Sequence, residues 1–325
     1  MTWKVLALPP LPEDALRGLL ADLAGRVEVA VPARRDRAAL LETLRDTEIV
    51  VGDWSGALAL DEEAVRLAPR LAFVQQPSVG VDGHDLAALA RAGVPLANTA
   101  GVNAVAVAEW CLAAALALLR HLVEGDREMR AGGWPQFAHQ RRELAGSRVG
   151  VVGFGPIGAA CARMFGALGC PVSYWSRSPK PESYGAAYLD LDELVASSDV
   201  LVLAVPLTEE TRGLLGEARL GRMPRGSVLV NAARGGVVDE GALLAALESG
   251  HLAGAALDVF DAEPPPAGDP LRSCATVLLS PHAAGVTPQA TARLLRCVLS
   301  NLTAALDGRP VANVVNGADP LVRRR

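Results

Sequence analysis

The chain has 325 residues, of which 50% are hydrophobic and 21% charged, so it is long enough for two domains with sizeable cores. Its formal net charge of -5 argues against a broadly basic face and hence against a nucleic-acid partner. The longest apolar stretch, 111–119, is too short for a membrane span, and residues 1–10 lack the pattern of a signal peptide. The five scattered cysteines show no C-x-x-C spacing. We therefore expect a cytoplasmic protein without a disulfide framework or a metal site.

Short apolar runs alternate with helical patterns along the first hundred residues. The predicted strands are Val5–Leu8, Val27–Val31, Ile49–Val51, Leu71–Gln75 and Pro95–Ala97, with amphipathic helices at Glu13–Leu23 and Asp61–Leu67. Strand–helix alternation with short connections predicts a parallel sheet that is covered on both faces.

A second alternating series begins at residue 148. Its predicted strands are Arg148–Val152, Val172–Trp175, Val200–Ala204, Val228–Asn231, Ala255–Val259 and Val277–Leu279, and its predicted helices are Ile157–Leu168, Asp190–Ala196, Arg219–Met223 and Glu240–Glu248. The long helical pattern at Pro288–Leu306 has no sheet of its own, so we expect it to pack back on the first domain. The predicted domains are therefore 1–101 with 284–325, and 102–283. The predicted fold class is α/β, with two doubly wound parallel sheets.

The run Gly153-Phe154-Gly155-Pro156-Ile157-Gly158 follows a predicted strand and opens a predicted helix. In this context G-x-G-x-x-G is typical of a dinucleotide site. The first glycine allows the tight turn, the second lets the backbone approach a pyrophosphate, and the third lets the helix pack on the sheet. The helix N-terminus faces the phosphate charge. We expect residues 102–283 to form a Rossmann dinucleotide-binding domain.

The next predicted strand ends at Trp175, and Ser176, Arg177 and Ser178 follow it. NAD enzymes usually place an acid at this position to bind the ribose 2′-hydroxyl. A hydroxyl and a guanidinium would instead bind a 2′-phosphate. The segment favours NADP(H), and an NAD(H) enzyme that lacks the usual acid is the alternative.

Hydride transfer to a 2-keto acid needs a cation for the carboxylate and a proton donor that titrates near neutral pH. Histidine suits the second role, and a neighbouring carboxylate favours its charged form. Arg234, Glu263 and His282 follow three successive predicted strands of the second sheet. Ligands of doubly wound sheets lie beyond the carboxyl ends of the strands, so all three residue types are expected near the nicotinamide.

These segments resemble the signatures of the D-isomer-specific 2-hydroxyacid dehydrogenase family. The G-x-G-x-x-G turn, the A-R-G-G-x-V-D-E run, the L-D-V-F-x-x-E-P run and the S-P-H-x-A-G run occur in the family's order. The resemblance extends from Gln76 to about Asn316. It implies a flavodoxin-like substrate domain and a Rossmann domain with a cleft between them, and a homodimer in which 103–119 contributes to the interface.

The resemblance also implies roles for individual residues. It implies that Arg234 anchors the carboxylate, that Glu263 partners His282, and that His282 is the general acid in reduction and the base in oxidation. Asp258 is expected beside the nicotinamide carboxamide. The predicted cofactor-binding residues are Gly153, Phe154, Gly155, Pro156, Ile157, Gly158, Ser176, Arg177, Ser178, Val205, Pro206, Thr211, Ala232, Ala233, Arg234, Asp258, His282 and Gly285.

Substrate-binding residues are expected mainly in the first domain. The run Ser78-Val79-Gly80-Val81-Asp82 matches the family loop whose backbone amides hold the substrate carboxylate, so Val79 and Gly80 join Arg234 and His282 as candidates. Trp54 ends a predicted strand of the first domain and is a further candidate, with core packing as the alternative. Trp134 resembles a position that reaches the partner subunit's site in glyoxylate/hydroxypyruvate reductases, with a dimer-interface aromatic as the alternative. The remaining histidines are interpreted as structural: His84, His121, His139 and His251.

The predicted function is reduction of glyoxylate, hydroxypyruvate or a related small 2-keto acid with NADPH. Glu263 disfavours formate dehydrogenase, which has a glutamine at that position, and the chain ends without the regulatory domain of many phosphoglycerate dehydrogenases. Branched, aromatic or phosphonate-bearing keto acids stay open as substrates. A phosphite dehydrogenase and a dinucleotide-sensing corepressor that binds peptides also stay open as functions.

Overall fold

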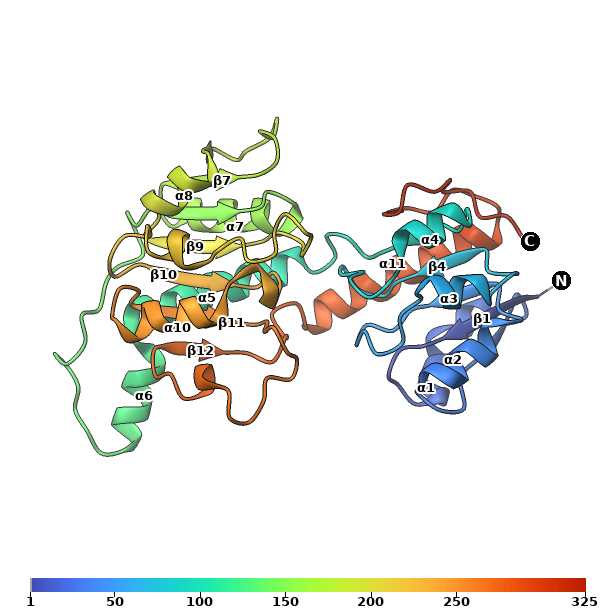
Figure 1. Cartoon of the computed structure of the whole chain (residues 1–325), viewed down its shortest axis with the longest axis horizontal. Coiled ribbons are helices and arrows are strands. Elements are labelled where there is room, and N and C mark those ends of the chain that lie inside the picture. The colour runs from blue at the N-terminus through green and yellow to red at the C-terminus, as the bar shows by residue number, and fades with distance from the viewer. Residues whose placement is uncertain (1) are drawn as a thin grey trace. The chain divides into compact units, whose positions relative to one another are not determined.

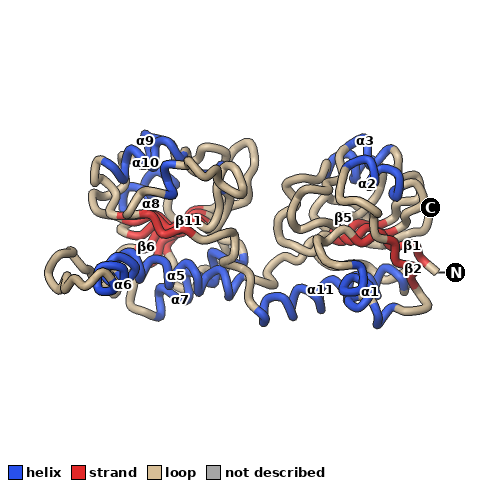
Figure 2. Tube along the Cα trace, turned by 90° about the horizontal axis from the view of Figure 1, so that it is seen from below, coloured by secondary structure: helices blue, strands red, loops and turns tan. Residues whose placement is uncertain are grey.

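The computed structural model describes residues 2–325 as two compact units (Figure 1). Unit 1 comprises the residues up to Val102 together with Pro288–Arg325, and unit 2 comprises Asn103–Thr287. Each unit is a parallel β-sheet with helices on both faces (Figure 2). The predicted α/β fold class with two doubly wound sheets is confirmed. The assignment of substrate and cofactor roles to the two units stays a prediction.

Unit 1 contains a five-stranded sheet in the order β2-β1-β3-β4-β5. Its strands are β1 (Trp3–Ala7), β2 (Val27–Ala30), β3 (Ile49–Val51), β4 (Phe73–Gln75) and β5 (Leu96–Ala97). Its helices are α1 (Glu13–Leu19), the 3-10 turn Ala21–Leu23, α2 (Arg37–Leu44), α3 (Glu62–Arg66), α4 (Leu86–Arg91) and α11 (Pro288–Leu306). In Figure 2, α1 and α11 cover one face of this sheet and α2 and α3 cover the other.

The helices of unit 1 begin where a side chain can accept the free N–H groups of the first turn. Asp36, Asp61 and Asp85 each accept from a backbone amide three residues ahead and thereby start α2, α3 and α4. The C-terminal helix α11 is fixed to the sheet by a buried amide. Asn301 Nδ2 donates to Gln75 Oε1 over 2.8 Å.

Unit 2 contains a seven-stranded sheet in the order β12-β11-β10-β9-β6-β7-β8. Its strands are β6 (Val149–Val152), β7 (Val172–Trp175), β8 (Ala187–Tyr188), β9 (Val200–Leu203), β10 (Val228–Asn231), β11 (Gly254–Leu257) and β12 (Val277–Leu279). Its helices are α5 (Ala104–Arg120), α6 (Leu122–Arg130), α7 (Pro156–Ala167), α8 (Leu191–Ser197), α9 (Glu217–Leu220) and α10 (Glu240–Glu248), with short 3-10 turns at Gly235–Val237 and Pro270–Arg272. In Figure 2, α5 and α7 lie on one face of this sheet and α8, α9 and α10 on the other.

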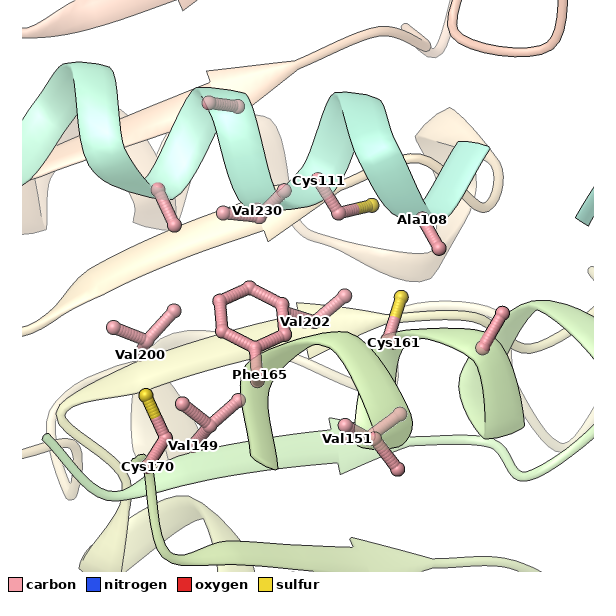
Figure 3. Packing of buried hydrophobic residues seen from close by; sticks show 14 of the residues in the cluster. Ala108, Cys111, Val149, Val151, Cys161, Phe165, Cys170, Val200, Val202 and Val230 are labelled. Carbon is pink, nitrogen blue, oxygen red and sulfur yellow. The ribbon is translucent and has the colours of Figure 1, made fainter. Parts of the chain in front are cut away.

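The core of unit 2 is packed between α5, α7 and the central strands. Figure 3 shows Cys111 of α5 facing Cys161 and Phe165 of α7, with Val151 and Val202 of the sheet beside them. All five side chains are almost completely buried. Burying side chains of this size contributes roughly 1.5–3 kcal/mol each, which holds α5 and α7 firmly against the strands. The positions of the strand ends, where the site residues lie, are therefore set by a rigid core.

Both sheets reverse their strand order once. In unit 1 the reversal lies between β1 and β3, and in unit 2 it lies between β6 and β9. Crossovers leave in opposite directions from these neighbouring strands, which opens a crevice at their carboxyl ends where ligands bind in such folds. Each unit thus has one position that its topology favours for a ligand.

The secondary structure departs from the sequence expectation at several places. The predicted helix Glu13–Leu23 is divided into α1 and a 3-10 turn, and the predicted strand Ala255–Val259 ends at Leu257. The predicted ranges do not include α2, α4, α6 or β8. The first two are helices of only eight and six residues, α6 has no buried residue, and β8 is a two-residue edge strand.

A left-handed residue, His121, separates α5 from α6 with φ 50°. Within residues 2–325, no single helix is long and apolar enough to cross a bilayer. The pair α5 and α6 meets the length and composition criterion only jointly, and it is bent by 59° at this break.

Candidate active site

The glycine turn of unit 2 lies at the carboxyl end of β6, at the point where the strand order reverses. Gly153 has φ 98°, and a Cβ there would lie 2.4 Å from the Ala204 carbonyl oxygen. A Cβ on Gly158 would lie 2.0 Å from the Gly153 carbonyl oxygen. A Cβ on Gly155 would meet nothing within 4 Å, so the backbone is open to a ligand at this residue alone of the three.

The turn leads directly into the N-terminus of α7, with Gly155 as its N-cap and Pro156 in the first turn. The free N–H groups of a 12-residue helix provide partial positive charge for a pyrophosphate. The Phe154 side chain is buried and packs against the ring of Tyr174, 3.9 Å between centroids, so only its backbone can contact a cofactor. The residues present therefore fit a dinucleotide.

The segment after β7 carries the predicted ribose-binding residues. The side chain of Ser176 is buried and its hydroxyl donates to the Ser178 carbonyl over 2.7 Å, which folds the segment into a tight turn. Arg177 and Lys180 are exposed on this turn. The backbone amide of Lys180 donates to the Tyr174 hydroxyl over 2.8 Å. Lys180 was not among the predicted site residues, although it is one of only two lysines in the chain.

The segment after β9 faces the same edge of the sheet. The Thr211 hydroxyl donates to the Pro206 carbonyl over 2.7 Å and accepts from the Thr208 amide over 2.7 Å, which closes the loop that begins at Val205. The Thr208 side chain, and to a lesser extent the charge of Arg177, lower the pKa of Glu210. This places the 176–178 turn near the loop after β9.

The segment after β10 is shaped by Asn231. Its side-chain amide donates to the Arg234 carbonyl over 3.0 Å and accepts from the Ala233 amide over 3.0 Å. Ala232 lies within this turn, and Arg234 Nη1 donates to the Ala233 carbonyl over 2.7 Å. A Cβ on Gly235 would lie 2.0 Å from the Phe260 carbonyl carbon, so the turn packs tightly against the segment after β11.

Asp258 connects the segments after β11 and β12. Its two carboxylate oxygens accept from the amides of Ala283 and Ala284 over 2.7 and 2.9 Å, and its carbonyl accepts from the His282 amide over 2.8 Å. Asp258 is 2% exposed. Its carboxylate therefore holds the loop that carries His282, and its predicted contact with the nicotinamide carboxamide stays a prediction. A Cβ on Gly285, which follows this loop, would lie 2.6 Å from Asn103 Nδ2.

Glu263 and His282 are in direct contact. His282 Nδ1 lies 2.7 Å from Glu263 Oε2, while Glu263 Oε1 accepts from the Phe260 amide over 3.0 Å. The His282 side chain is 50% exposed and that of Glu263 37%. A carboxylate held at Nδ1 fixes the ring orientation, stabilises the imidazolium and leaves Nε2 for a substrate. This is the arrangement that acid–base chemistry requires.

In unit 1 the predicted carboxylate loop follows β4. The carbonyl groups of its first three residues are all occupied: the Thr99 amide donates to Ser78 O over 3.1 Å, Asn98 Nδ2 donates to Val79 O over 2.7 Å, and the Ser78 hydroxyl donates to Gly80 O over 2.8 Å. Within residues 2–325, the amides of Val79 and Gly80 have no acceptor. A loop whose carbonyl groups are already hydrogen-bonded and whose adjacent amides are unpaired can bind an anion through those amides.

Trp54 lies just beyond β3 and is 42% exposed. It borders a small hollow on this side of the sheet. The lining residues are all apolar: Ala7, Pro9, Leu16, Leu19, Leu20, Val51, Trp54, Pro77, Leu294, Leu295 and Val298. Because Ala7 ends β1 and Val51 ends β3, the hollow lies at the strand-order reversal of unit 1. Another hollow, around Asp192 and Arg222, contains none of the predicted site residues.

The structure thus assembles most of the predicted residues of unit 2 at one sheet edge. The glycine turn, the 176–178 turn and the segments after β9, β10, β11 and β12 all lie at carboxyl ends of parallel strands. Trp134 is separate from them: it follows α6, is 77% exposed, and donates from Nε1 to Gln136 over 3.4 Å. Within residues 2–325, no cluster of His, Cys, Asp or Glu suits a metal ion.

A glycine turn at the strand-order reversal, together with a carboxylate–histidine pair at the same sheet edge, defines a nicotinamide-dependent dehydrogenase. Comparison with known proteins leads to the same class. A family model described as the NAD binding domain of D-isomer specific 2-hydroxyacid dehydrogenase matches residues 112–284.

Similar proteins cover most of the chain. A glyoxylate reductase of Korarchaeum cryptofilum is 38% identical over 284 residues, which are 85% of this chain and 85% of that protein. A glyoxylate reductase of Pyrococcus furiosus is 37% identical over 324 residues, 96% of this chain and 95% of that protein. The apo structure of D-mandelate dehydrogenase from Rhodotorula graminis has a TM-score of 0.89 at 27% identity and covers 99% of this chain and 100% of its own.

This chain therefore belongs to the D-isomer specific 2-hydroxyacid dehydrogenase family. It is an NAD(P)-dependent oxidoreductase that acts on a hydroxyl or keto group.

Proposed function

We propose that this protein reduces a small 2-keto acid to the D-2-hydroxy acid with NADPH. The observation that carries the proposal is the His282–Glu263 pair, 2.7 Å between Nδ1 and Oε2, at the sheet edge that also bears the glycine turn. The identities with two glyoxylate reductases support a small keto acid as the substrate.

The roles of the residues follow from their chemistry. A bound nicotinamide supplies the hydride. His282 Nε2 donates the proton that the carbonyl oxygen takes up during reduction, while Glu263 stabilises the imidazolium before transfer. Arg234 is the proposed carboxylate anchor in unit 2, and the free amides of Val79 and Gly80 are the proposed anion donors in unit 1. Fixing the carboxylate orients the carbonyl group for attack.

The preference for NADPH rests on the turn after β7. Ser176 replaces the acid that would repel a 2′-phosphate, and Arg177 and Lys180 supply two exposed cations within four residues of it. The charge of Arg177 contributes to the lowered pKa of Glu210, so the two side chains interact. A 2′-phosphate would compete with this carboxylate for the guanidinium, so the preference over NADH is expected to be partial.

One observation favours a second substrate class. The hollow beside Trp54 is lined only by apolar residues and lies where the topology of unit 1 favours a ligand, and Pro77 of its lining is two residues from Val79. A keto acid that ends in a methyl group would place that group against this apolar lining. The hydroxyl group of hydroxypyruvate would be buried without a partner, at a cost of about 1–3 kcal/mol.

We also propose a homodimer. The α6 helix has no buried residue, and apolar side chains on it and on the following loop are exposed: Leu122, Val123, Met129, Trp134 and Phe137, the last at 89%. Several large apolar residues left exposed on one helix and the loop after it are typical of an interaction surface. Sedimentation of the wild type and of Phe137→Ser tests this proposal, with dimer expected for the first and a shift toward monomer for the second.

The experiment for the reaction is the decay of nicotinamide absorbance with purified protein. Glyoxylate, hydroxypyruvate and 2-oxobutanoate are each offered with NADPH and with NADH, and His282→Ala serves as the inactive control. Hydroxypyruvate and 2-oxobutanoate differ mainly by a hydroxyl in place of a methyl group. A higher kcat/KM for 2-oxobutanoate would support the aliphatic class, and a higher value for hydroxypyruvate would rule it out. No decay with any pair would contradict the proposed function.

A further inference from the structure

His84 lies at the start of a chain of hydrogen bonds that ends in the proposed carboxylate loop. The Leu60 amide donates to His84 Nδ1 over 3.1 Å, and His84 Nε2 lies 3.1 Å from Gln76 Oε1. Gln76 Nε2 in turn lies 3.1 Å from the Asp53 carbonyl and 2.9 Å from the Ser78 hydroxyl. The chain ends where Ser78 donates to the Gly80 carbonyl.

The direction of each bond is determined by groups that can act in only one way. A backbone amide can only donate, so Nδ1 of His84 must be unprotonated and a neutral ring carries its proton on Nε2. Nε2 therefore donates to Gln76, whose oxygen must face it. The amide nitrogen of Gln76 then faces Asp53 O, which can only accept. The orientation of the Gln76 side-chain amide is thus determined by His84 on one side and by the Asp53 carbonyl on the other.

Burial supports the same protonation state. Desolvation lowers the pKa of His84 from 6.5 to about 4, although the negative charge of Asp53 acts in the opposite direction. Asp53 is itself buried and paired with Arg35, 2.8 Å between Oδ2 and Nη2. At neutral pH the ring is the neutral Nε2–H form that the bond directions require.

The side chain of Gln76 has little freedom to adopt another position. It is 3% exposed, and a Cβ on Gly52 would lie 1.9 Å from its Oε1. A buried amide that donates to two acceptors and accepts from one donor has its rotamer fixed. Any movement of Gln76 would release the Ser78 hydroxyl, which is the group that holds the Gly80 carbonyl.

We propose that His84 and Gln76 are positioning residues for substrate binding: acting through Ser78, they hold the carbonyl of Gly80 so that the amides of Val79 and Gly80 face the keto-acid carboxylate. This inference rests on the proposed function, in which that loop binds the carboxylate. It assigns a role to a histidine that the sequence pattern indicates only as structural.

Two conservative substitutions separate positioning from local stabilisation. Gln at residue 84 can place an amide N–H near the position of Nε2, so His84→Gln preserves the link to Gln76 and loses the acceptor for Leu60. Asn is shorter and can place its oxygen near the position of Nδ1, so His84→Asn preserves the acceptor for Leu60 and loses the link. Positioning through Gln76 predicts that the Gln variant resembles the wild type and the Asn variant does not.

The readouts are the KM and kcat for glyoxylate, the Kd for oxamate with NADPH present, and the Kd for NADPH alone. For His84→Asn we expect KM and the oxamate Kd to rise about tenfold, with kcat within about threefold and NADPH binding unchanged. Ser78→Ala, which cuts a later link, should behave in the same way. Asp85→Asn is the matched control, since asparagine is also a good N-cap for α4 and residue 85 lies outside the chain of bonds.

A wild-type-like Asn variant together with an impaired Gln variant would overturn the inference, because the histidine would then serve only Leu60. Wild-type KM and oxamate affinity in both variants and in Ser78→Ala would also overturn it, while leaving the proposed function intact. If the wild type neither reduces any keto acid nor binds oxamate, the proposed function fails and the inference fails with it.

Discussion

Glu263 Oε2 lies 2.7 Å from Nδ1 of His282, and the other oxygen of the same carboxylate accepts from the Phe260 amide over 3.0 Å. The carboxylate is thus fixed from one side by the backbone and fixes the imidazole on the other. His282 itself has φ 54°, a left-handed conformation that is uncommon outside glycine. Asp258 accepts from the two amides that follow His282 and holds the loop in this form.

Glu263→Gln is expected to lower kcat for keto-acid reduction by about ten- to a hundredfold. The amide keeps a group near Nδ1 but carries no charge to stabilise the imidazolium. Steady-state kcat of the variant and of the wild type measures the effect, and NADPH binding is the control. An unchanged kcat would show that Glu263 does not act on the proton donor.

The glycine turn predicts opposite outcomes for two neighbouring substitutions. Gly158→Ala should destabilise the fold by about 1–3 kcal/mol, because its Cβ would lie 2.0 Å from the Gly153 carbonyl oxygen. Gly155→Ala should leave thermal stability unchanged, because its Cβ meets no protein atom within 4 Å. That Cβ would instead occupy the approach of a pyrophosphate, so the NADPH Kd should rise at least about tenfold.

Thermal melting and fluorescence titration with NADPH separate these two outcomes. If Gly155→Ala binds NADPH as tightly as the wild type, the pyrophosphate does not approach this residue. If Gly158→Ala melts at the wild-type temperature, the helix α7 can move away from the turn at no cost.

Arg177→Ala is expected to raise the KM for NADPH by about ten- to a hundredfold, because a charge-assisted hydrogen bond to the 2′-phosphate is lost. The KM for NADH should stay unchanged. Lys180→Ala should also raise the KM for NADPH alone, but by a smaller factor, because Lys180 lies farther along the turn than Ser176 and Arg177. Parallel kinetics with the two cofactors measure this. Equal effects on NADPH and NADH would indicate a general contribution to binding rather than recognition of the 2′-phosphate.

The buried His84 makes the stability of unit 1 depend on pH. Its pKa falls from 6.5 to about 4 on folding. Between pH 6.5 and 4 the unfolded chain therefore binds a proton at this residue and the folded chain does not. The free energy of unfolding should be unaffected above about pH 6.5 and should decrease as the pH falls toward 4, by about 3 kcal/mol in total. Below pH 4 the two states bind the proton alike and the loss levels off.

Urea denaturation of the wild type and of His84→Gln between pH 4 and 8 tests this expectation. Other groups titrate in both proteins, so the relevant quantity is the difference between the two curves. A difference that stays constant over the whole range would show that His84 is protonated to the same extent in the folded and unfolded states.

The sequence alone was sufficient for the fold class and the family. Unbroken apolar runs such as Val200–Leu203 are typical of strands buried on both faces, and the glycine turn between a strand and a helix has a physical reason for each glycine. Arg234, Glu263 and His282 each follow such a run. Because parallel strands all end at one edge, their chain positions already implied a common location.

The tertiary structure decided what depends on atoms far apart in the chain. Two contacts show how the catalytic loops are held. The Gly235 turn packs against Phe260, and the Asp258 carboxylate accepts hydrogen bonds from the amides of Ala283 and Ala284. The role of His84 is a clearer case. Its sequence context is ordinary, and its partners come from residues 60 and 76, so no local pattern could indicate the chain of bonds that leads to Gly80. Periodicity reports which face of an element is buried, whereas hydrogen-bond direction is determined by the three-dimensional neighbours of each group.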